Sequence, residues 1–163
     1  MYKKILVPLD GSELAECVLP HVESIAKGCG AQEVIFLRVV EPLRWVVGSS
    51  YMASGGDDAI NLRGDEMKLI DSENKAAAEK YLSQLVDPTK YNGVNVRSEV
   101  IYGRAAESIA DYTTKNGVDL ITIATHGRSG VSRWVWGSVA DRVLRSACVP
   151  VLMVRAPGCI PGI

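Results

Sequence analysis

The sequence lacks a charge surplus of either sign: 18 Lys and Arg residues oppose 19 Asp and Glu residues, for a formal net charge of −1. Proteins that bind nucleic acid are usually visibly basic, because Lys and Arg neutralise the phosphates. The chain also lacks any run of the ~20 apolar residues that a membrane-spanning helix needs. We therefore expect neither a nucleic-acid partner nor a membrane span.

We also expect the N-terminal segment not to be a secretory signal. The N-terminus is MYKKILVPLD, in which Pro8 and Asp10 interrupt a short apolar run. Such a run is typical of a first strand and not of a signal peptide. From this we expect a cytoplasmic location.

The chain has few residues suited to binding metal. The four cysteines form no CxxC pair and are expected to be thiols rather than a disulfide framework: Cys17, Cys29, Cys148 and Cys159. The two histidines, His21 and His126, are lone residues far apart in the sequence. Roles other than metal binding are therefore favoured for both histidines.

What is present is an ordinary globular composition. The 163 residues are 47% hydrophobic and 23% charged. A chain of this length forms one domain that buries roughly 70% of the surface its unfolded form exposes. We assign that domain to residues 1–155 and treat 156–163, rich in Pro and Gly, as a C-terminal tail. Residues 43–64 show little periodicity and are expected to form a long surface loop.

Strand and helix patterns alternate along the chain. Apolar runs predict strands at 3–9, 33–40, 94–101, 118–124 and 150–154, and helical spacing predicts helices at 14–28, about 65–86, 105–116 and 138–146. This alternation implies right-handed crossovers and an α/β fold with a five-stranded, doubly wound parallel sheet, which we expect in the order 3-2-1-4-5. In the helix at about 65–86, the residues expected to face the core are Met67, Ile70, Ala77, Tyr81 and Leu85.

The binding site is expected where the strand order reverses, because ligands of doubly wound sheets bind there, beyond the carboxyl ends of the strands. With this strand order, the point lies between the first and the fourth strand. The segments that follow these strands are 10–12 and 125–130, and both are rich in small polar residues. We therefore expect these two segments to border the site.

The segment ATHGRSGVSRWVWGS, residues 124–138, has the composition of an anion-binding loop. Its glycines let backbone amides approach an oxyanion closely and permit positive φ angles. The helix that begins at Ser138 adds free amides and a positive dipole end, and Arg128 adds a positive charge. The alternative is a tight turn in which Ser138 is an ordinary N-cap, because the segment matches neither the Walker A loop nor GxGxxG.

Three stretches resemble the universal stress protein family: KKILVPLDGS (3–12), IFLRVVEP (35–42) and ATHGRSG…GSVADRVL (124–144). The resemblance spans the chain up to Arg155. The family's nucleotide signature is Gly, two residues, Gly, nine residues, Gly and then Ser or Thr. Here Gly127, nine residues and Gly137-Ser138 match the signature, whereas Ala124 replaces its first glycine.

The resemblance implies a Rossmann-like fold of the adenine nucleotide α-hydrolase type, which binds ATP or AMP and usually forms a homodimer. It puts Asp10 near the ribose and any Mg²⁺, with Pro8 and Val39 against the adenine. The residues that it assigns to the phosphate side are Ala124, Gly127, Arg128, Gly130, Gly137, Ser138, Val139 and Ala140. The last strand is a sheet edge, and the resemblance implies that two subunits pair there.

Several residues have a structural alternative. Asp10 follows a strand and would otherwise cap the first helix. Val39 belongs either to the core or to the wall of the site. Trp134 and Trp136 either form an exposed surface for a partner or pack beneath the loop.

Two classes of function follow. The favoured one is a stress-response regulator that binds ATP or AMP and presents an altered surface to an unknown protein partner. The alternative is a slow ATPase or phosphotransferase, which needs a base or water-orienting group near the γ-phosphate. Asp10, Arg128 and His126 are candidates, but they form no recognisable acid–base pair, so at most weak hydrolysis is expected. An electron carrier or response regulator on the same fold is a weaker third class.

Overall fold

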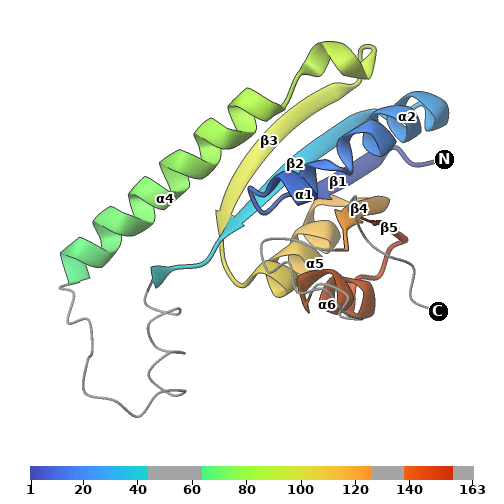
Figure 1. The fold of residues 1–163 in the computed structure, drawn as a ribbon. Helices are drawn as coiled ribbons and strands as arrows, with labels where there is room; N and C mark the ends of the chain where they lie inside the picture. Colours follow the sequence, from blue (N-terminus) through green and yellow to red (C-terminus); the bar gives the residue numbers. More distant parts are fainter. Residues whose placement is uncertain (44–63, 126–137, 156–163) are drawn as a thin grey trace.

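The computed structural model describes residues 1–43, 64–125 and 138–155. Its parallel sheet has the predicted order, β3-β2-β1-β4-β5 (Figure 1). The strands are β1 (Lys4–Pro8), β2 (Glu33–Val40), β3 (Asn95–Tyr102), β4 (Leu120–Ala124) and β5 (Val151–Val154). The helices are α1 (Glu13–Glu16), α2 (Leu19–Cys29), α4 (Gly64–Leu85), α5 (Ala105–Asn116) and α6 (Ser138–Ser146), with the short 3₁₀-helix η1 at Pro88–Tyr91. Most of the predicted loop 43–64 and the tail 156–163 lie outside the described residues.

Helices cover both faces of the sheet, and alternate strand residues belong to one face or the other. Ile5 and Val7 of β1 pack in one cluster with residues of α1, α2 and α4. Leu6, between them, packs in the second cluster with residues of α5 and α6. Because both faces of the inner strands are buried, their sequences are apolar without interruption. The predicted doubly wound architecture is confirmed.

The helix predicted from Leu14 onward is not continuous. The structure divides it into α1 and α2, and Pro20 lies in the first turn of α2. A proline has no N–H to donate, so it fits the first turn of a helix but would break a hydrogen bond inside a longer one. Gly30 then ends α2 in the left-handed conformation, at φ 62°.

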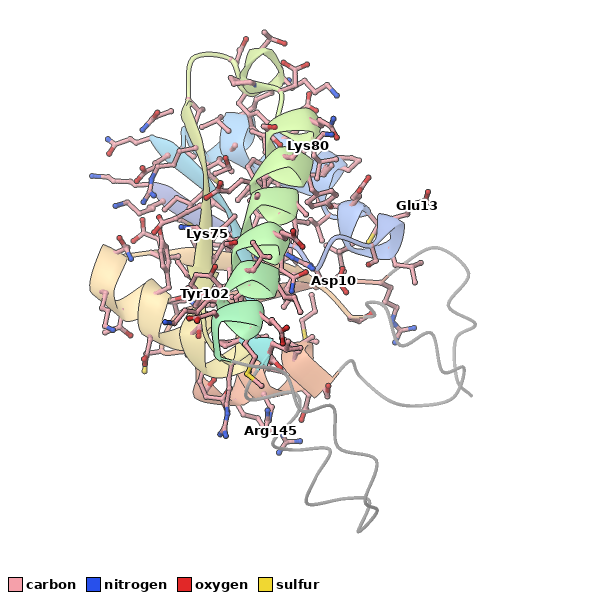
Figure 2. The ribbon with its side chains drawn as sticks, turned by 90° about the vertical axis from the view of Figure 1, so that its left-hand side faces the viewer. Asp10, Glu13, Lys75, Lys80, Tyr102 and Arg145 are labelled. Carbon is pink, nitrogen blue, oxygen red and sulfur yellow. The ribbon has the colours of Figure 1, made fainter. Side chains whose placement is uncertain are left out.

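Helix α4 lies along the edge strand β3, as Figures 1 and 2 show. Tyr102 of β3 donates its hydroxyl to the carbonyl oxygen of Asp71, at 3.0 Å, and Lys75 Nζ lies 5.9 Å from the centre of the Tyr102 ring. The buried residues of α4 are Ala78 and Leu82, which the spacing did not predict. Of the residues predicted to face inward, Ala77 is exposed and Met67, Ile70, Tyr81 and Leu85 are half-buried. The apolar stripe was misassigned because α4 is mostly polar and buries only a short part of its length.

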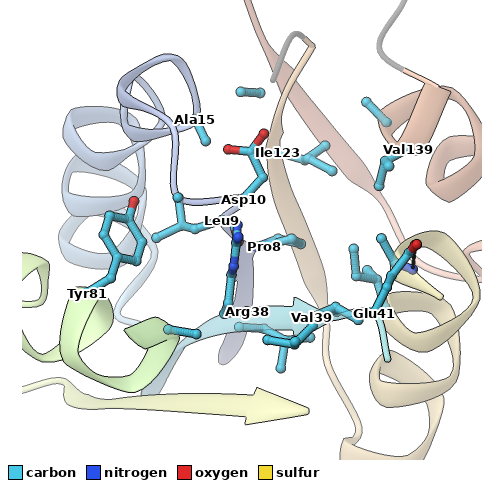
Figure 3. Close-up of a pocket in the computed structure, with 18 of the residues that line it drawn as sticks. Pro8, Leu9, Asp10, Ala15, Arg38, Val39, Glu41, Tyr81, Ile123 and Val139 are labelled. Atoms are coloured by element: carbon cyan, nitrogen blue, oxygen red, sulfur yellow. Dashed lines mark hydrogen bonds between the residues drawn. The ribbon is translucent and has the colours of Figure 1, made fainter. Parts of the chain in front are cut away.

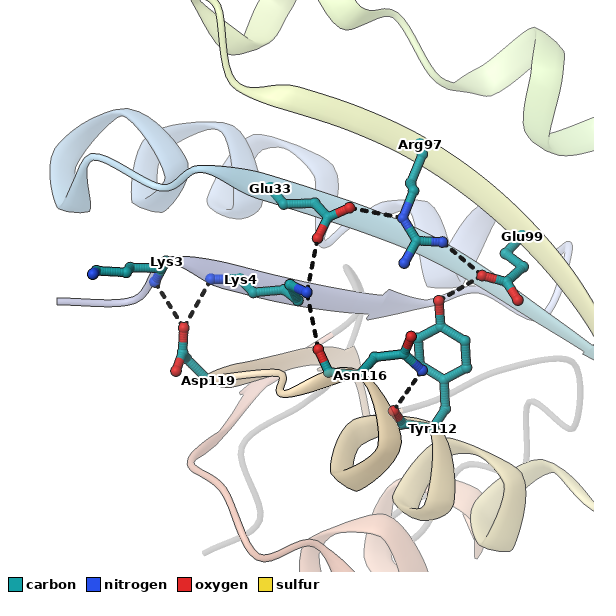
Figure 4. A network of polar contacts seen from close by, with 8 residues as sticks. All are labelled: Lys3, Lys4, Glu33, Arg97, Glu99, Tyr112, Asn116 and Asp119. Carbon is teal, nitrogen blue, oxygen red and sulfur yellow. Dashed lines mark hydrogen bonds and ion pairs between the residues drawn. The ribbon is translucent and has the colours of Figure 1, made fainter.

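A polar network ties together the amino-terminal ends of the strands, on the side of α5 (Figure 4). Arg97 of β3 pairs with Glu33 at 2.8 Å and with Glu99 at 2.6 Å, and Tyr112 of α5 donates its hydroxyl to Glu99 at 2.5 Å. Lys4 joins the network through Glu33, at 3.1 Å. Lys4 and Glu33 begin β1 and β2, and the network reaches from there to Glu99 in the middle of β3. The carboxyl ends of the strands lie beyond it. No helix in the described part of the chain is long and apolar enough to span a membrane.

Candidate functional site

A cavity of about 660 Å³ opens at the carboxyl ends of β1, β2 and β4 (Figure 3). This is the predicted place, because the chain leaves β1 toward β2 and later crosses to β4 on the other side of β1. The cavity reaches both faces of the sheet, with α1 and α4 on one side and α5 and α6 on the other. Its volume lies within the range of about 300–1,000 Å³ that small-molecule sites occupy.

The residues expected at the site from both ends of the sequence line this one cavity: Pro8, Asp10, Val39, Ala124, Ser138, Val139 and Ala140. The remaining expected site residues lie outside the described residues: Gly127, Arg128, Gly130 and Gly137. The same is true of His126, Trp134 and Trp136. Val39 combines both interpretations offered for it, since it lines the cavity and packs against the core cluster of α5 and α6.

The turn between β1 and α1 presents Asp10 to the cavity. One oxygen of the Asp10 carboxylate accepts hydrogen bonds from the Ser12 amide at 3.0 Å and from the Ser12 hydroxyl at 2.5 Å. The Ser12 hydroxyl in turn accepts from the Ala15 amide at 3.2 Å and so caps α1. The alternative in which Asp10 itself caps the first helix is therefore wrong. Asp10 supports the cap residue and lines the cavity.

Arg38 is a lining residue that sequence reasoning missed, whereas Gly11 lies in segment 10–12, which was expected to border the site. Arg38 of β2 donates from Nη1 to the carbonyl oxygen of Leu9, at 3.3 Å. Gly11 has a φ of +78°, and a Cβ built there would lie 3.3 Å from Arg38 Nη1. The signal for Arg38 was present, because it is a charged residue inside the otherwise apolar run VIFLRVV.

Tyr81 of α4 closes the side of the cavity formed by α1 and α4. Its hydroxyl donates to a carboxylate oxygen of Glu16 in α1, at 3.1 Å. Burial first of all, and then the hydrogen bond to Glu16, raise the pKa of Tyr81 well above its usual value. Tyr81 therefore stays neutral and keeps its proton to donate. Sequence spacing suggested only that Tyr81 faces inward and held no sign of Glu16 as its partner.

The opposite side of the cavity combines apolar surface with the beginnings of two helices. Ile109 and Val139 contribute apolar surface, and α6 begins at Ser138, beside the cavity. Glu41, which follows β2, accepts a hydrogen bond from the Ala105 amide in the first turn of α5, at 3.4 Å. The start of a helix is the positive end of its dipole and suits a negatively charged group.

The described lining has the chemistry of a binding site for a partly apolar, partly polar molecule. Pro8, Val39 and Ile109 can contact a flat ring, while Asp10 and Glu41 are acceptors. Within residues 1–43, 64–125 and 138–155, no group of three or more His, Cys, Asp and Glu side chains is arranged to hold a metal ion. The fold and this cavity define a doubly wound α/β protein with a cavity at its topological switch point, where proteins of this architecture bind their ligands.

The chain belongs to the universal stress protein family, whose model matches residues 1–155. It is 32% identical to universal stress protein MJ0531 of Methanocaldococcus jannaschii over 157 residues, which are 96% of this chain and 84% of that protein. It is 31% identical to universal stress protein MJ0577 of the same organism over 160 residues, covering 95% of this chain and 96% of that protein.

Solved structures agree with this assignment. The structure of MJ0577 superposes with a TM-score of 0.75 at 26% identity, over 97% of this chain and 99% of that chain. A family member from Arabidopsis thaliana, whose structure has AMP bound, superposes with a TM-score of 0.61. The latter is 14% identical over 96% of this chain and 93% of that chain, so it shows likeness of fold alone.

Proposed function

We propose that this protein binds an adenine nucleotide, ATP or AMP, in the cavity and acts as a homodimeric regulator in the stress response. One observation carries the proposal. The residues after β1 and those at the start of α6, far apart in sequence, border a single cavity that has apolar walls and a carboxylate. That combination suits a molecule with a flat ring, a hydroxylated sugar and an anionic tail. The structure of the Arabidopsis family member with AMP bound supports it, because this fold can hold an adenine nucleotide.

In the proposed complex, each part of the nucleotide meets a different part of the lining. The adenine lies against Pro8 and Val39, and a ribose hydroxyl donates to the Asp10 carboxylate. The phosphates accept from the amides of Val139 and Ala140 and from the Ser138 hydroxyl, at the positive end of α6. From the sequence signature, Gly127, Arg128, Gly130 and Gly137 complete the phosphate side.

A bound Mg²⁺ would neutralise phosphate charge in this site. Mg²⁺ is commonly held by one or two protein carboxylates together with phosphate oxygens and waters. Asp10 fits this requirement, since it is a carboxylate at the edge of the cavity. Asp10 would then hold the ion together with the nucleotide's own phosphates.

The proposed dimer forms through β5. Among the residues that the structure describes, this strand pairs only with β4, and Val151, Leu152 and Met153 are half-buried within one chain. An exposed apolar edge is a ready template for another strand, and a twofold axis lets two copies of β5 pair antiparallel.

The test of nucleotide binding begins with the freshly purified protein. The protein is denatured, any released small molecule is identified by mass, and stripped protein is titrated with ATP, AMP and GTP. We expect an adenine nucleotide to be released or to bind. At a ligand concentration one hundred times its Kd, the free energy of unfolding should rise by about 2.7 kcal/mol.

Two variants test whether the nucleotide signature is responsible for the binding of ATP. Gly127→Val should abolish the binding of ATP, because a side chain would keep the backbone amides from the phosphates. Gly28→Val is the matched control, since a Cβ at Gly28 meets nothing within 4 Å and the residue lies in α2, away from the cavity. Wild-type protein that neither carries nor binds an adenine nucleotide would overturn the proposed function.

A further inference from the structure

Arg38 occupies an unusual position for a charged side chain. It lies on β2, a strand whose other residues from Val34 to Val40 are all apolar. Strand residues alternate between faces, so Arg38 shares the face of Phe36, which packs with residues of α1, α2 and α4. Val39 is directed to the opposite face. Arg38 therefore enters the cavity from the face of the sheet that α1, α2 and α4 cover.

The guanidinium of Arg38 holds the turn that carries Asp10. Nη1 donates to the Leu9 carbonyl oxygen at 3.3 Å, on the residue just before Asp10. The guanidinium also lies against Gly11, the residue just after, where a Cβ would approach to 3.3–3.4 Å of its atoms. Both neighbours of Asp10 thus lie against one planar cation. Figure 3 shows Arg38 beside Leu9 and Asp10.

The charges of Arg38 and Asp10 also affect Tyr81, on the wall of the same cavity. After burial and the hydrogen bond to Glu16, the pKa of Tyr81 is lowered by the charge of Arg38 and raised by the charge of Asp10. Both charges therefore act on Tyr81, which lines the same cavity. Among the lining residues that the structure describes, Arg38 has the only positively charged side chain, beside the carboxylates of Asp10 and Glu41.

We propose that Arg38 is a positioning residue, which fixes the turn at Leu9–Gly11 so that the Asp10 carboxylate meets a ribose hydroxyl of the bound nucleotide. This inference rests on the proposed function and goes beyond it, because it assigns recognition of the sugar to a residue outside the nucleotide signature. A hydrogen bond depends steeply on distance and angle, so a loosened turn weakens it even though Asp10 remains. Arg38 acts through Asp10 and need not touch the nucleotide.

The experiment compares the Kd of ATP with those of 2′-deoxy-ATP and 3′-deoxy-ATP, by calorimetry. In wild-type protein, removing the hydroxyl that donates to Asp10 should weaken binding about tenfold to a hundredfold, the usual worth of a hydrogen bond to a charged group. We express this as the ratio of the Kd of the deoxy analogue to the Kd of ATP. Arg38→Met keeps the packing of the side-chain stem and removes the guanidinium, so the ratio should fall to about twofold. Arg38→Lys should restore part of the ratio, because lysine can still reach the Leu9 carbonyl with one donor.

Two further variants separate positioning from general stability. Arg97→Met removes a guanidinium from β3 at the other end of the sheet and should lower stability without changing the ratio. Asp10→Ala should abolish the ratio, and adding Arg38→Met to it should change the ratio no further, as expected for two residues that act as a unit. Arg38→Gln provides a second uncharged variant if Arg38→Met does not fold.

The outcomes are distinct. Wild-type protein that binds no nucleotide overturns the proposed function itself. Wild-type protein that binds ATP but does not distinguish it from either deoxy analogue overturns the inference about Arg38. So does an Arg38→Met or Arg38→Gln protein that folds and keeps the wild-type ratio, even where its overall affinity is lower.

Discussion

At the cavity, the absence of a side chain at Gly11 matters as much as the charged residues do. Gly11 lies in the left-handed region, where a Cβ meets the backbone, and it also lies under the guanidinium of Arg38. Because of both conditions, replacing Gly11 with any other residue would lower stability. The turn therefore combines a glycine for its shape, an arginine for its position and the Asp10 carboxylate for its chemistry.

Gly11→Ala should lower both stability and nucleotide affinity. Holding alanine at a φ of +78° costs about 1 kcal/mol or more in the free energy of unfolding. The added methyl also displaces Arg38, so the Kd for ATP should rise severalfold. Gly93→Ala is the matched control: its φ is +86°, and nothing lies within 4 Å of the new Cβ. Urea unfolding should show similar losses for both variants, and calorimetry a weaker affinity for Gly11→Ala alone; equal affinities would contradict the role of the turn.

At the scale of elements, the outer layers are joined to the sheet by tyrosines. Tyr91 of η1 packs edge-on against Phe36 of β2, with ring centres 5.9 Å apart. Tyr112 of α5 donates to Glu99 of β3. Burial is the first cause that raises the pKa of each of these tyrosines, to about 12. Each contact thus depends on the neutral form of the phenol.

Stability should therefore decline in alkaline solution. The folded pKa values of Tyr91 and Tyr112 are raised from 10 to about 12. Their contribution is complete below pH 10 and is lost as the pH rises toward 12, because the unfolded chain releases these protons first. Urea unfolding at pH 8, 10 and 11 should show the decline. Tyr91→Phe keeps the ring on Phe36 and should make the decline shallower; an unchanged slope would exclude Tyr91 as a source.

At the start of α1, one residue, Ser12, fixes where the helix begins. Ser12 caps α1 and also donates to Asp10. Ser12→Ala should lower the free energy of unfolding by about 1 kcal/mol, the usual loss on removing an N-cap side chain. Ser24→Ala in α2 is the control, because its exposed hydroxyl donates only to the carbonyl oxygen of Pro20. That change should stay within about 0.5 kcal/mol of the wild type; equal losses would contradict the assignment of the cap.

For the whole molecule, the proposed dimer can be tested at the outer side of β5. The carbonyl oxygens of Pro150 and Val154 accept from Ile121 and Thr125, so alternate residues of β5 are directed toward β4. Met153 is out of phase with them, and its amide is directed to the open edge. Met153→Pro removes that one donor and keeps the ladder to β4. Light scattering should give a monomer of about 17.6 kDa for this variant and twice that mass for the wild type; a wild-type monomer would contradict the dimer.

The sequence by itself determined the α/β class, the parallel sheet and the segments that border the site. Apolar runs that alternate with helical spacing leave few topologies, and in the expected order 3-2-1-4-5, which the structure confirms, the ends of β1 and β4 lie side by side. Asp10 and Ser138 could be assigned because they lie after a strand end and at a helix start, whereas Pro8 was assigned from the family resemblance. Only the tertiary structure decided that Arg38 holds the Leu9 carbonyl, 29 residues away, and that Tyr81 donates to Glu16, 65 residues away. Local patterns record which face of an element is apolar, whereas the pairing of two distant side chains depends on how whole elements pack together.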